Sequence, residues 1–202
     1  MNNKQESSGQ ASVSEVKREE GMTFSQLIYD WLGTLLLVGV LVLLFMTFFI
    51  RQVNVKGDSM NNTLQDKDRL LVYSFFYTPQ QGDIVIVNHG KLDVNDPVQE
   101  PIIKRVIAVE GQTVEILPQT GQVMVDGRIL EESYVTGPTT LRGGSAIENP
   151  VTVPKGYVYV MGDNRGNSMD SRNKKVGLVP LENIVGKAIF RVQPMNSFGK
   201  IE

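Results

Sequence analysis

Cysteine is absent from this chain of 202 residues, and His89 is its only histidine. The first absence excludes a thiol protease, a disulfide framework, a cysteine-ligated zinc site and an iron–sulfur cluster. The second excludes a histidine-rich metal site by counting alone, so we predict neither a metal nor a cofactor. The net charge of −2 gives no electrostatic support to nucleic-acid binding, and we predict no nucleic-acid partner.

Charged residues are also missing from residues 31–50, a run that begins with Trp31 and is closed by Arg51. Twenty helical residues span about 30 Å, the thickness of a bilayer core. A cleavable signal peptide would have a shorter apolar core, and a buried soluble helix would have a polar face. We therefore predict a membrane anchor helix over residues 23–51, preceded by a disordered head over residues 1–22. Basic residues flank the run on both sides, so the positive-inside rule leaves its orientation open.

The rest of the chain consists of short β-branched runs separated by turns that contain glycine or proline. This alternation of short β-branched runs and turns predicts an all-β domain of coiled sheets or a barrel over residues 52–202, without long amphipathic helices. The fold class is thus mainly β, with a single N-terminal transmembrane helix. The predicted strands are Arg69–Tyr73, Asp83–Val87, Ile102–Val109, Thr113–Leu117, Val123–Val125, Val151–Val153, Tyr157–Met161 and Lys187–Val192.

Two segments of this domain carry an unusual set of polar residues. Gly57–Met60 is a tight turn that places Ser59 shortly after the anchor, although an ordinary turn leaving the membrane would look similar. Val160–Arg172 packs acids, arginines, asparagines and serines closely behind a strand, and the alternative here is a long polar hairpin loop. His89 lies in a polar stretch and is interpreted as a surface residue.

A third segment contains a lysine among β-branched residues. On a strand, Lys104 shares one face with Ile102, Val106 and Ala108. Such surroundings predict a desolvated amine, which favours the neutral form, whereas an edge-strand lysine that protects against aggregation is the alternative. Lowering a lysine pKa from about 10.4 to neutrality corresponds to roughly 4 kcal/mol, which burial can supply. A serine and a neutral lysine together indicate a serine–lysine hydrolase.

These motifs, in this order after an anchor, resemble those of bacterial type I signal peptidase, in its compact Gram-positive form. The resemblance covers about residues 25–192 and rests on five blocks: Gly57–Met60, Gly82–Val85, Ile103–Val106, Gly162–Arg165 and Asn167–Arg172. It implies a serine endopeptidase with a signal peptidase/LexA-like β fold that removes signal peptides from exported preproteins after small residues of the Ala-x-Ala type. The implied partners are these preproteins and the lipid bilayer.

The resemblance also implies a role for individual residues. Ser59 matches the nucleophile, Lys104 the general base, and Ser168 the serine that orients the lysine amine. Asp170 and Arg172 match a supporting ion pair. The implied substrate pockets are lined by Met60 and Ile103, with Ile102 and Met169 as further candidates.

The resemblance further implies a single-pass protein of the cytoplasmic membrane, with a cytoplasmic head and an extracytoplasmic catalytic domain. This sequence departs from the family pattern at Gly57, where some members carry a serine that donates a hydrogen bond to the oxyanion. The second oxyanion donor is therefore unassigned, and losing one donor costs about 10²–10³ in rate.

Two alternatives belong to other functional classes. A LexA-type self-cleaving protease would share the serine and lysine elements but would need a DNA-reading N-terminus in place of residues 31–50. A membrane-anchored β-domain with a degenerate site would act only as a binding module. The aromatic run Phe75–Tyr77 is either a contact with the membrane interface or part of the core.

Overall fold

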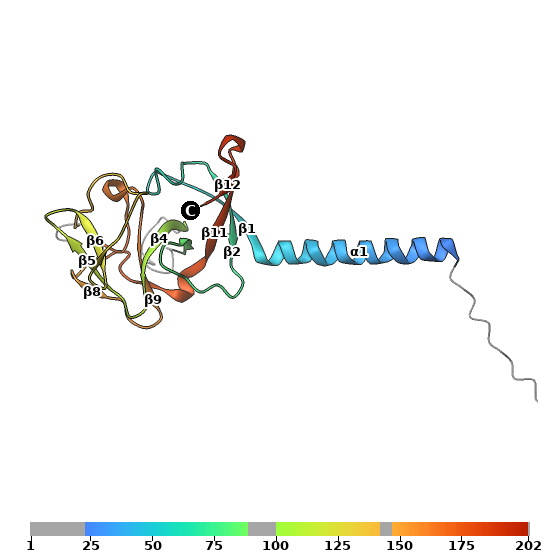
Figure 1. Cartoon of the computed structure of the whole chain (residues 1–202), viewed down its shortest axis with the longest axis horizontal. Helices are drawn as coiled ribbons and strands as arrows, with labels where there is room; N and C mark the ends of the chain where they lie inside the picture. Colours follow the sequence, from blue (N-terminus) through green and yellow to red (C-terminus); the bar gives the residue numbers. More distant parts are fainter. Residues whose placement is uncertain (1–22, 89–99, 142–146, 202) are drawn as a thin grey trace, which may run out of the picture. The chain divides into compact units, whose positions relative to one another are not determined.

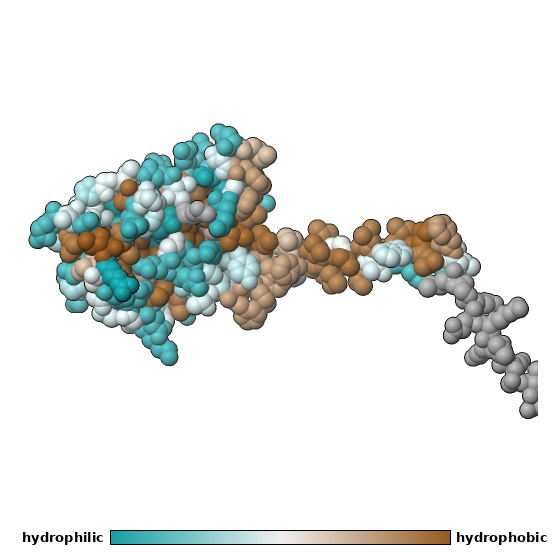
Figure 2. Space-filling view, viewed as in Figure 1, coloured by the Kyte–Doolittle hydropathy of each residue, from teal (hydrophilic) through white to brown (hydrophobic). Residues whose placement is uncertain are grey.

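The computed structural model describes residues 23–88, 100–141 and 147–201. The predicted head, residues 1–22, and His89 both lie outside the described residues. Within them, the one α-helix is α1 (Phe24–Phe49), whose side chains are exposed almost throughout. Residues 24–47 are long and apolar enough to cross a membrane, and Figure 2 shows this apolar surface on the helix.

The helix ends two residues before the predicted end of the anchor. Ile50 and Arg51 already belong to strand β1 (Ile50–Asn54), where they pair with Tyr73 and Val72 of β2. The helix ends at Phe49 because the next residues pair with β2. An apolar run by itself does not show where such a pairing begins, so the sequence did not predict this boundary.

The β-rich part of the chain contains two antiparallel sheets (Figure 1). The larger has the order β1-β2-β11-β3-β4-β9-β10, with β12 paired to β11, and the smaller has the order β7-β6-β5-β8. The strands after β1 are β2 (Arg69–Tyr73), β3 (Ile84–Val87), β4 (Ile102–Val109), β5 (Thr113–Leu117), β6 (Gln122–Val125), β7 (Arg128–Ile129), β8 (Val151–Thr152), β9 (Tyr157–Met161), β10 (Val179–Pro180), β11 (Ile184–Gln193) and β12 (Gly199–Lys200). This arrangement confirms the predicted mainly-β fold class.

All eight predicted strands are present, four of them with the predicted bounds. β1, β7, β10 and β12 were not predicted; the last three have two residues each, too few to show an alternating pattern. Between the strands, 3-10 turns occur at Arg165–Asn167, Leu181–Asn183 and Met195–Ser197.

Strand β4 connects the three clusters of buried apolar side chains that form the core. Ile103 packs in the first cluster, Ile107 in the second and Val106 in the third. A register shift against β9 between Val106 and Ala108 turns Ala108 into the second cluster, beside Ile107. The prediction that Ala108 shares a face with Lys104 is therefore wrong, because a β-bulge adds one residue and reverses the alternation.

The residues of the aromatic run that follows β2 differ in burial. Tyr77 packs against the third cluster and donates a hydrogen bond of 2.6 Å to Asp83. Phe76 is 89% exposed with a φ of 45°, and its ring contacts that of Phe75 in a tilted arrangement, while Phe75 in turn contacts Phe49. Tyr77 is thus a core aromatic, whereas Phe76 is a surface residue.

Candidate active site

Ser59 lies on the turn that follows β1. Hydrogen bonds of Val55 and Gly57 to Asp68 and Asp66 hold the start of this turn, where Gly57 has a φ of 77° that favours glycine. The other side is held by Asn164, whose backbone N–H donates to the carbonyl of Ser59 at 3.0 Å. These contacts leave the Ser59 side chain half-buried at the rim of a groove.

Lys104 reaches Ser59 from β4. Its Nζ lies 2.8 Å from Ser59 Oγ and donates to the Ile103 carbonyl at 2.9 Å. In the same stretch β9 pairs with β4 only from Arg105 onward, so the backbone of residues 102–104 is not paired with β9. The sheet thus brings together a hydroxyl and an amine that lie 45 residues apart in the sequence.

The Lys104 side chain is only 3% exposed. Burial lowers the pKa of its amine to about 8, against the opposing charges of Asp170 and Asp163, which raise it. The predicted desolvation is therefore confirmed. The alternative of an exposed lysine at a sheet edge is wrong, because this stretch of β4 is covered on both faces by the core.

Asp170 and Arg172 form a fully buried ion pair behind the amine. Arg172 donates to the two carboxylate oxygens of Asp170 at 2.8 Å each, and to the carbonyls of Thr140 and Arg165. Burial alone would raise the pKa of Asp170, but the hydrogen bonds and charge of Arg172 outweigh this effect and lower it. The carboxylate is thus ionised beside Lys104, where it limits how far burial can lower the lysine pKa.

Ser168 is buried beside this pair, and its hydroxyl hydrogen bond contributes to the lowered pKa of Asp170. It also packs against Gly162, where an added Cβ would lie 2.2 Å from Ser168 Oγ and 2.4 Å from the carbonyl oxygen of Ser59. Only glycine fits between the two serines. Gly162 could have been noticed in the sequence, because it lies in the dense polar segment Val160–Arg172.

A second buried ion pair joins the same segment to the neighbour of Lys104. Arg105 donates to both carboxylate oxygens of Asp163, at 2.9 and 2.8 Å, and its guanidinium lies 3.9 Å from the ring centre of Tyr134. Asp163 also accepts a hydrogen bond of 2.6 Å from Thr63, on the helical turn after Ser59. The sequence analysis quoted Arg105 and Asp163 within its motifs but gave them no role, and it did not mention Thr63, because the partners of these residues lie far away along the chain.

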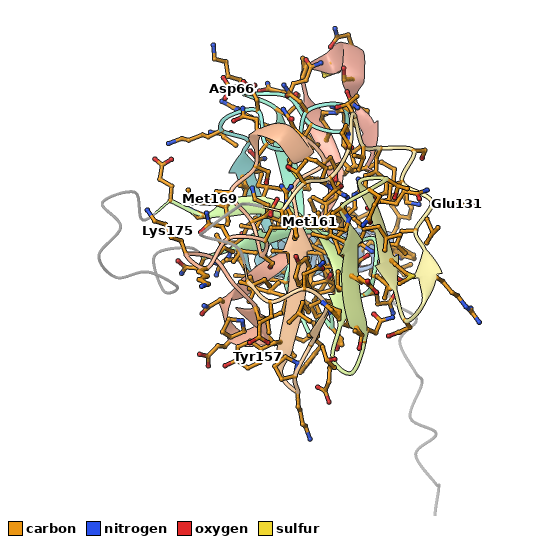
Figure 3. The ribbon with its side chains drawn as sticks, turned by 90° about the vertical axis from the view of Figure 1, so that its left-hand side faces the viewer. Asp66, Glu131, Tyr157, Met161, Met169 and Lys175 are labelled. Atoms are coloured by element: carbon orange, nitrogen blue, oxygen red, sulfur yellow. The ribbon has the colours of Figure 1, made fainter. Side chains whose placement is uncertain are left out.

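The polar residues behind β9 therefore form a buried network rather than a long exposed hairpin loop, so that alternative is wrong. In Figure 3, Met161 at the end of β9 lies in the middle of the molecule, and Met169 on the following loop lies to one side. The fully buried members, each less than 1% exposed, are Asp163, Arg165, Asp170, Ser171 and Arg172.

A cavity of about 430 Å³ runs between the segment before Ser59 and the start of β4. All four predicted pocket residues line it together with Ser59 and Lys104. Met60 and Ile103 are buried in its wall, while Met169 is half exposed at its margin. The lining residues are Val55, Lys56, Gly57, Ser59, Met60, Glu100, Pro101, Ile102, Ile103, Lys104 and Met169.

Known proteins resemble this chain over most of its length. Residues 28–193 match the family described as "Signal peptidase, peptidase S26". A probable signal peptidase I-1 of Synechocystis is 39% identical over 173 residues, covering 83% of this chain and 84% of that protein. Signal peptidase I of Bacillus licheniformis is 31% identical over 183 residues, covering 87% of this chain and 94% of that protein. A crystal structure of a signal peptidase I from Enterococcus faecalis aligns with a TM-score of 0.42 and 27% identity, covering 55% of this chain and 97% of that one.

Proposed function

Because the chain belongs to the signal peptidase family, peptidase S26, we propose that Ser59 and Lys104 perform the cleavage. The family makes the chain a serine endopeptidase of the signal peptidase I type, and the motif match predicted this family. The LexA-type and binding-module alternatives have no support from the comparisons. The distance of 2.8 Å between Lys104 Nζ and Ser59 Oγ carries the assignment of the two roles.

The reaction begins with proton transfer from Ser59 to the neutral amine of Lys104. The Ser59 oxygen attacks the scissile carbonyl, and the bond to the leaving amine breaks as Lys104 returns the proton to it. The acyl-enzyme ester is then hydrolysed by a water that Lys104 deprotonates. Ser168, Asp170 and Arg172 are positioning residues in this scheme, since they hold the segment behind the amine.

The substrate lies as an extended chain in the groove next to Ser59. The open edge of β4 at Ile103 offers backbone groups to such a peptide, in the manner of an added strand. Met60, Ile102, Ile103 and Met169 line the cavity, and of these Met60 and Ile103 are buried. A shallow apolar cavity of this kind accepts small side chains close to the cleaved bond and excludes larger ones, which fits an Ala-x-Ala recognition sequence.

The experiment is cleavage of a preprotein with an Ala-x-Ala site by the full chain in detergent, with N-terminal sequencing of the product. We expect cleavage directly after the second alanine by the wild type and a rate at least ~10³-fold lower for Ser59→Ala. The matched control is Ser74→Ala, an alcohol outside the site. Equal rates for Ser59→Ala and wild type would show that another group is the nucleophile.

We also propose that the chain spans the membrane once, with residues 1–22 in the cytoplasm and residues 52–202 outside. Helix α1 supports the anchor, and Ser59 follows Ile50 by nine residues, at most about 30 Å of extended chain. The site therefore works close to the bilayer, where the apolar segment of a substrate also lies.

The absence of cysteine makes this topology easy to test. A single cysteine is introduced at Ser7 or at the exposed Lys155, and intact bacterial cells are treated with a membrane-impermeant maleimide. We expect the Lys155→Cys protein to be labelled in intact cells and the Ser7→Cys protein only after lysis. The reverse pattern would contradict the proposed orientation.

A further inference from the structure

An ion pair joins the two chain segments that line the groove beside Ser59. Lys56, on the wall that leads to the nucleophile, pairs with Glu100, on the wall that leads to β4. Apart from Lys104, these are the only charged side chains among the described residues that line the groove. The groove therefore presents one positive and one negative group besides the lysine that pairs with Ser59.

The pair is unsuited to a structural role. The Lys56 and Glu100 side chains are 69% and 51% exposed, and exposed ion pairs contribute little to stability because water and salt screen them. In contrast, Asp163 and Asp170 pair with their arginines in full burial. A weak pair across a groove opens at little cost, so each partner is available to a side chain that enters between them.

Chain geometry locates the pair relative to the cleaved bond. Both walls run toward the dyad: Lys56 precedes Ser59 by three residues and Glu100 precedes Lys104 by four. At about 3.3 Å per extended residue these separations are at most about 10 and 13 Å between backbone positions, and the turn at Gly57 shortens the first of them. A substrate strand that runs parallel to both walls, with its scissile carbonyl at Ser59, has its fourth and fifth residues before the cleaved bond within reach of the Lys56 and Glu100 side chains.

We propose that the Lys56–Glu100 pair determines which charges the substrate carries at these two positions; this rests on the proposed function. In the wild type, an acidic substrate residue pairs with Lys56 and a basic one with Glu100, so both are accepted. When one partner is reversed, two like charges face the substrate and favour the opposite charge. The effect acts on binding, since the pair does not touch the reacting atoms.

The test uses the full chain in detergent and three peptides that differ only in Lys, Ser or Glu at the fifth residue before the cleaved bond. Wild type is expected to cleave all three with kcat/KM values within about threefold of one another. Lys56→Glu should favour the Lys peptide over the Glu peptide by about tenfold, and Glu100→Lys should reverse this preference. The doubly exchanged variant should return to the wild-type ratio, and the changes should appear in KM and weaken at ~0.5 M salt.

The control is Lys155→Glu, which makes the same change of charge at an exposed loop outside the groove. It should leave the ratio unchanged. Ratios that agree within about twofold among wild type and all charge variants would overturn the proposal. Absence of cleavage by the wild type, or full cleavage by Ser59→Ala, would instead contradict the proposed function, so the two failures are distinguishable.

Discussion

At the scale of single residues, Lys104 is the group on which the proposed chemistry depends. An exposed lysine is protonated at neutral pH and cannot accept a proton, whereas this amine has a pKa of about 8 because it is buried. Asp170 and Asp163 oppose this effect, so the environment makes the base available near neutrality without abolishing its charge at lower pH.

The dependence of the rate on pH tests this directly. Since the neutral amine is the active form, kcat/KM should rise about tenfold per pH unit below the pKa and level off above about 8. The measurement is peptide cleavage between pH 6 and 10, with Lys104→Ala as the inactive comparison. A midpoint near that of a free lysine, about 10.4, would contradict the assignment of the base.

The buried amine should also reduce stability. Its pKa is about 8 in the folded protein and 10.5 in the reference state, so the unfolded chain binds more protons between these values. The free energy of unfolding attributable to Lys104 therefore rises as pH increases from 8 to 10.5, and is lowest below pH 8.

Lys104→Met, which keeps the length and removes the amine, should thus be more stable than wild type at pH 7, by about 1–3 kcal/mol, and inactive. Urea denaturation of both proteins at pH 7 and at pH 10 provides the measurement, and the advantage of the variant should shrink at pH 10. A variant that is less stable than wild type at both pH values would contradict the expected cost of burying the amine.

At the scale of elements, the segment after β9 positions the serine turn. Asn164 holds the carbonyl of Ser59, Gly162 leaves room for Ser168, and Asp163 links Thr63 to Arg105. Backbone hydrogen bonds hold the turn that carries Ser59 together internally, and these contacts from the segment after β9 fix its position relative to β4.

Asp163→Asn is the sharpest test of this element. It leaves Arg105 buried without a counter-charge, and such a loss costs about 3–5 kcal/mol. The control, Glu100→Gln, breaks an exposed ion pair and should cost less than about 1 kcal/mol in urea denaturation. In the Asp163→Asn variant the pKa of Lys104 should also fall, because Asp163 raises it in the wild type. The pH–rate profile of this variant should therefore shift to lower pH. Equal stability of the two variants would argue against a structural role for the Arg105–Asp163 pair.

At the scale of the whole molecule, the chain divides into two units, Met1–Leu43 and Leu44–Glu202. The three apolar clusters all lie in the second unit, whereas the apolar side chains of α1 are exposed. The β-rich unit thus has a core of its own, and the helix has an apolar surface that only a bilayer or a detergent would cover.

Removal of residues 1–43 should therefore leave the fold and the site intact. We expect the thermal transition of the truncated protein to lie within about 5 °C of that of the full chain, and its cleavage of a soluble peptide to remain within about fivefold. Binding to phospholipid vesicles, measured by flotation, should fall by at least ~10-fold. Loss of the thermal transition would show that the helix is needed for folding.

Several features could be predicted from the sequence because they depend on local pattern. The charge-free run predicted the helix α1, and alternating β-branched residues between turns predicted the central strands. The motif match predicted the family, and it named Ser59 and Lys104, whose side chains lie 2.8 Å apart in the structure. Even the burial of Lys104 followed from its immediate neighbours.

Other features were decided by the tertiary structure, because they depend on which strands pair and in what register. The bulge in β4 turns Ala108 away from Lys104, and the packing of the turn after β1 against β4 brings Ser59 within 2.8 Å of the Lys104 amine. The partners Arg105–Asp163 and Lys56–Glu100 lie 58 and 44 residues apart. Local sequence sets the preference of each segment, but only the packed sheets determine which distant charges share a buried site or face each other across a groove.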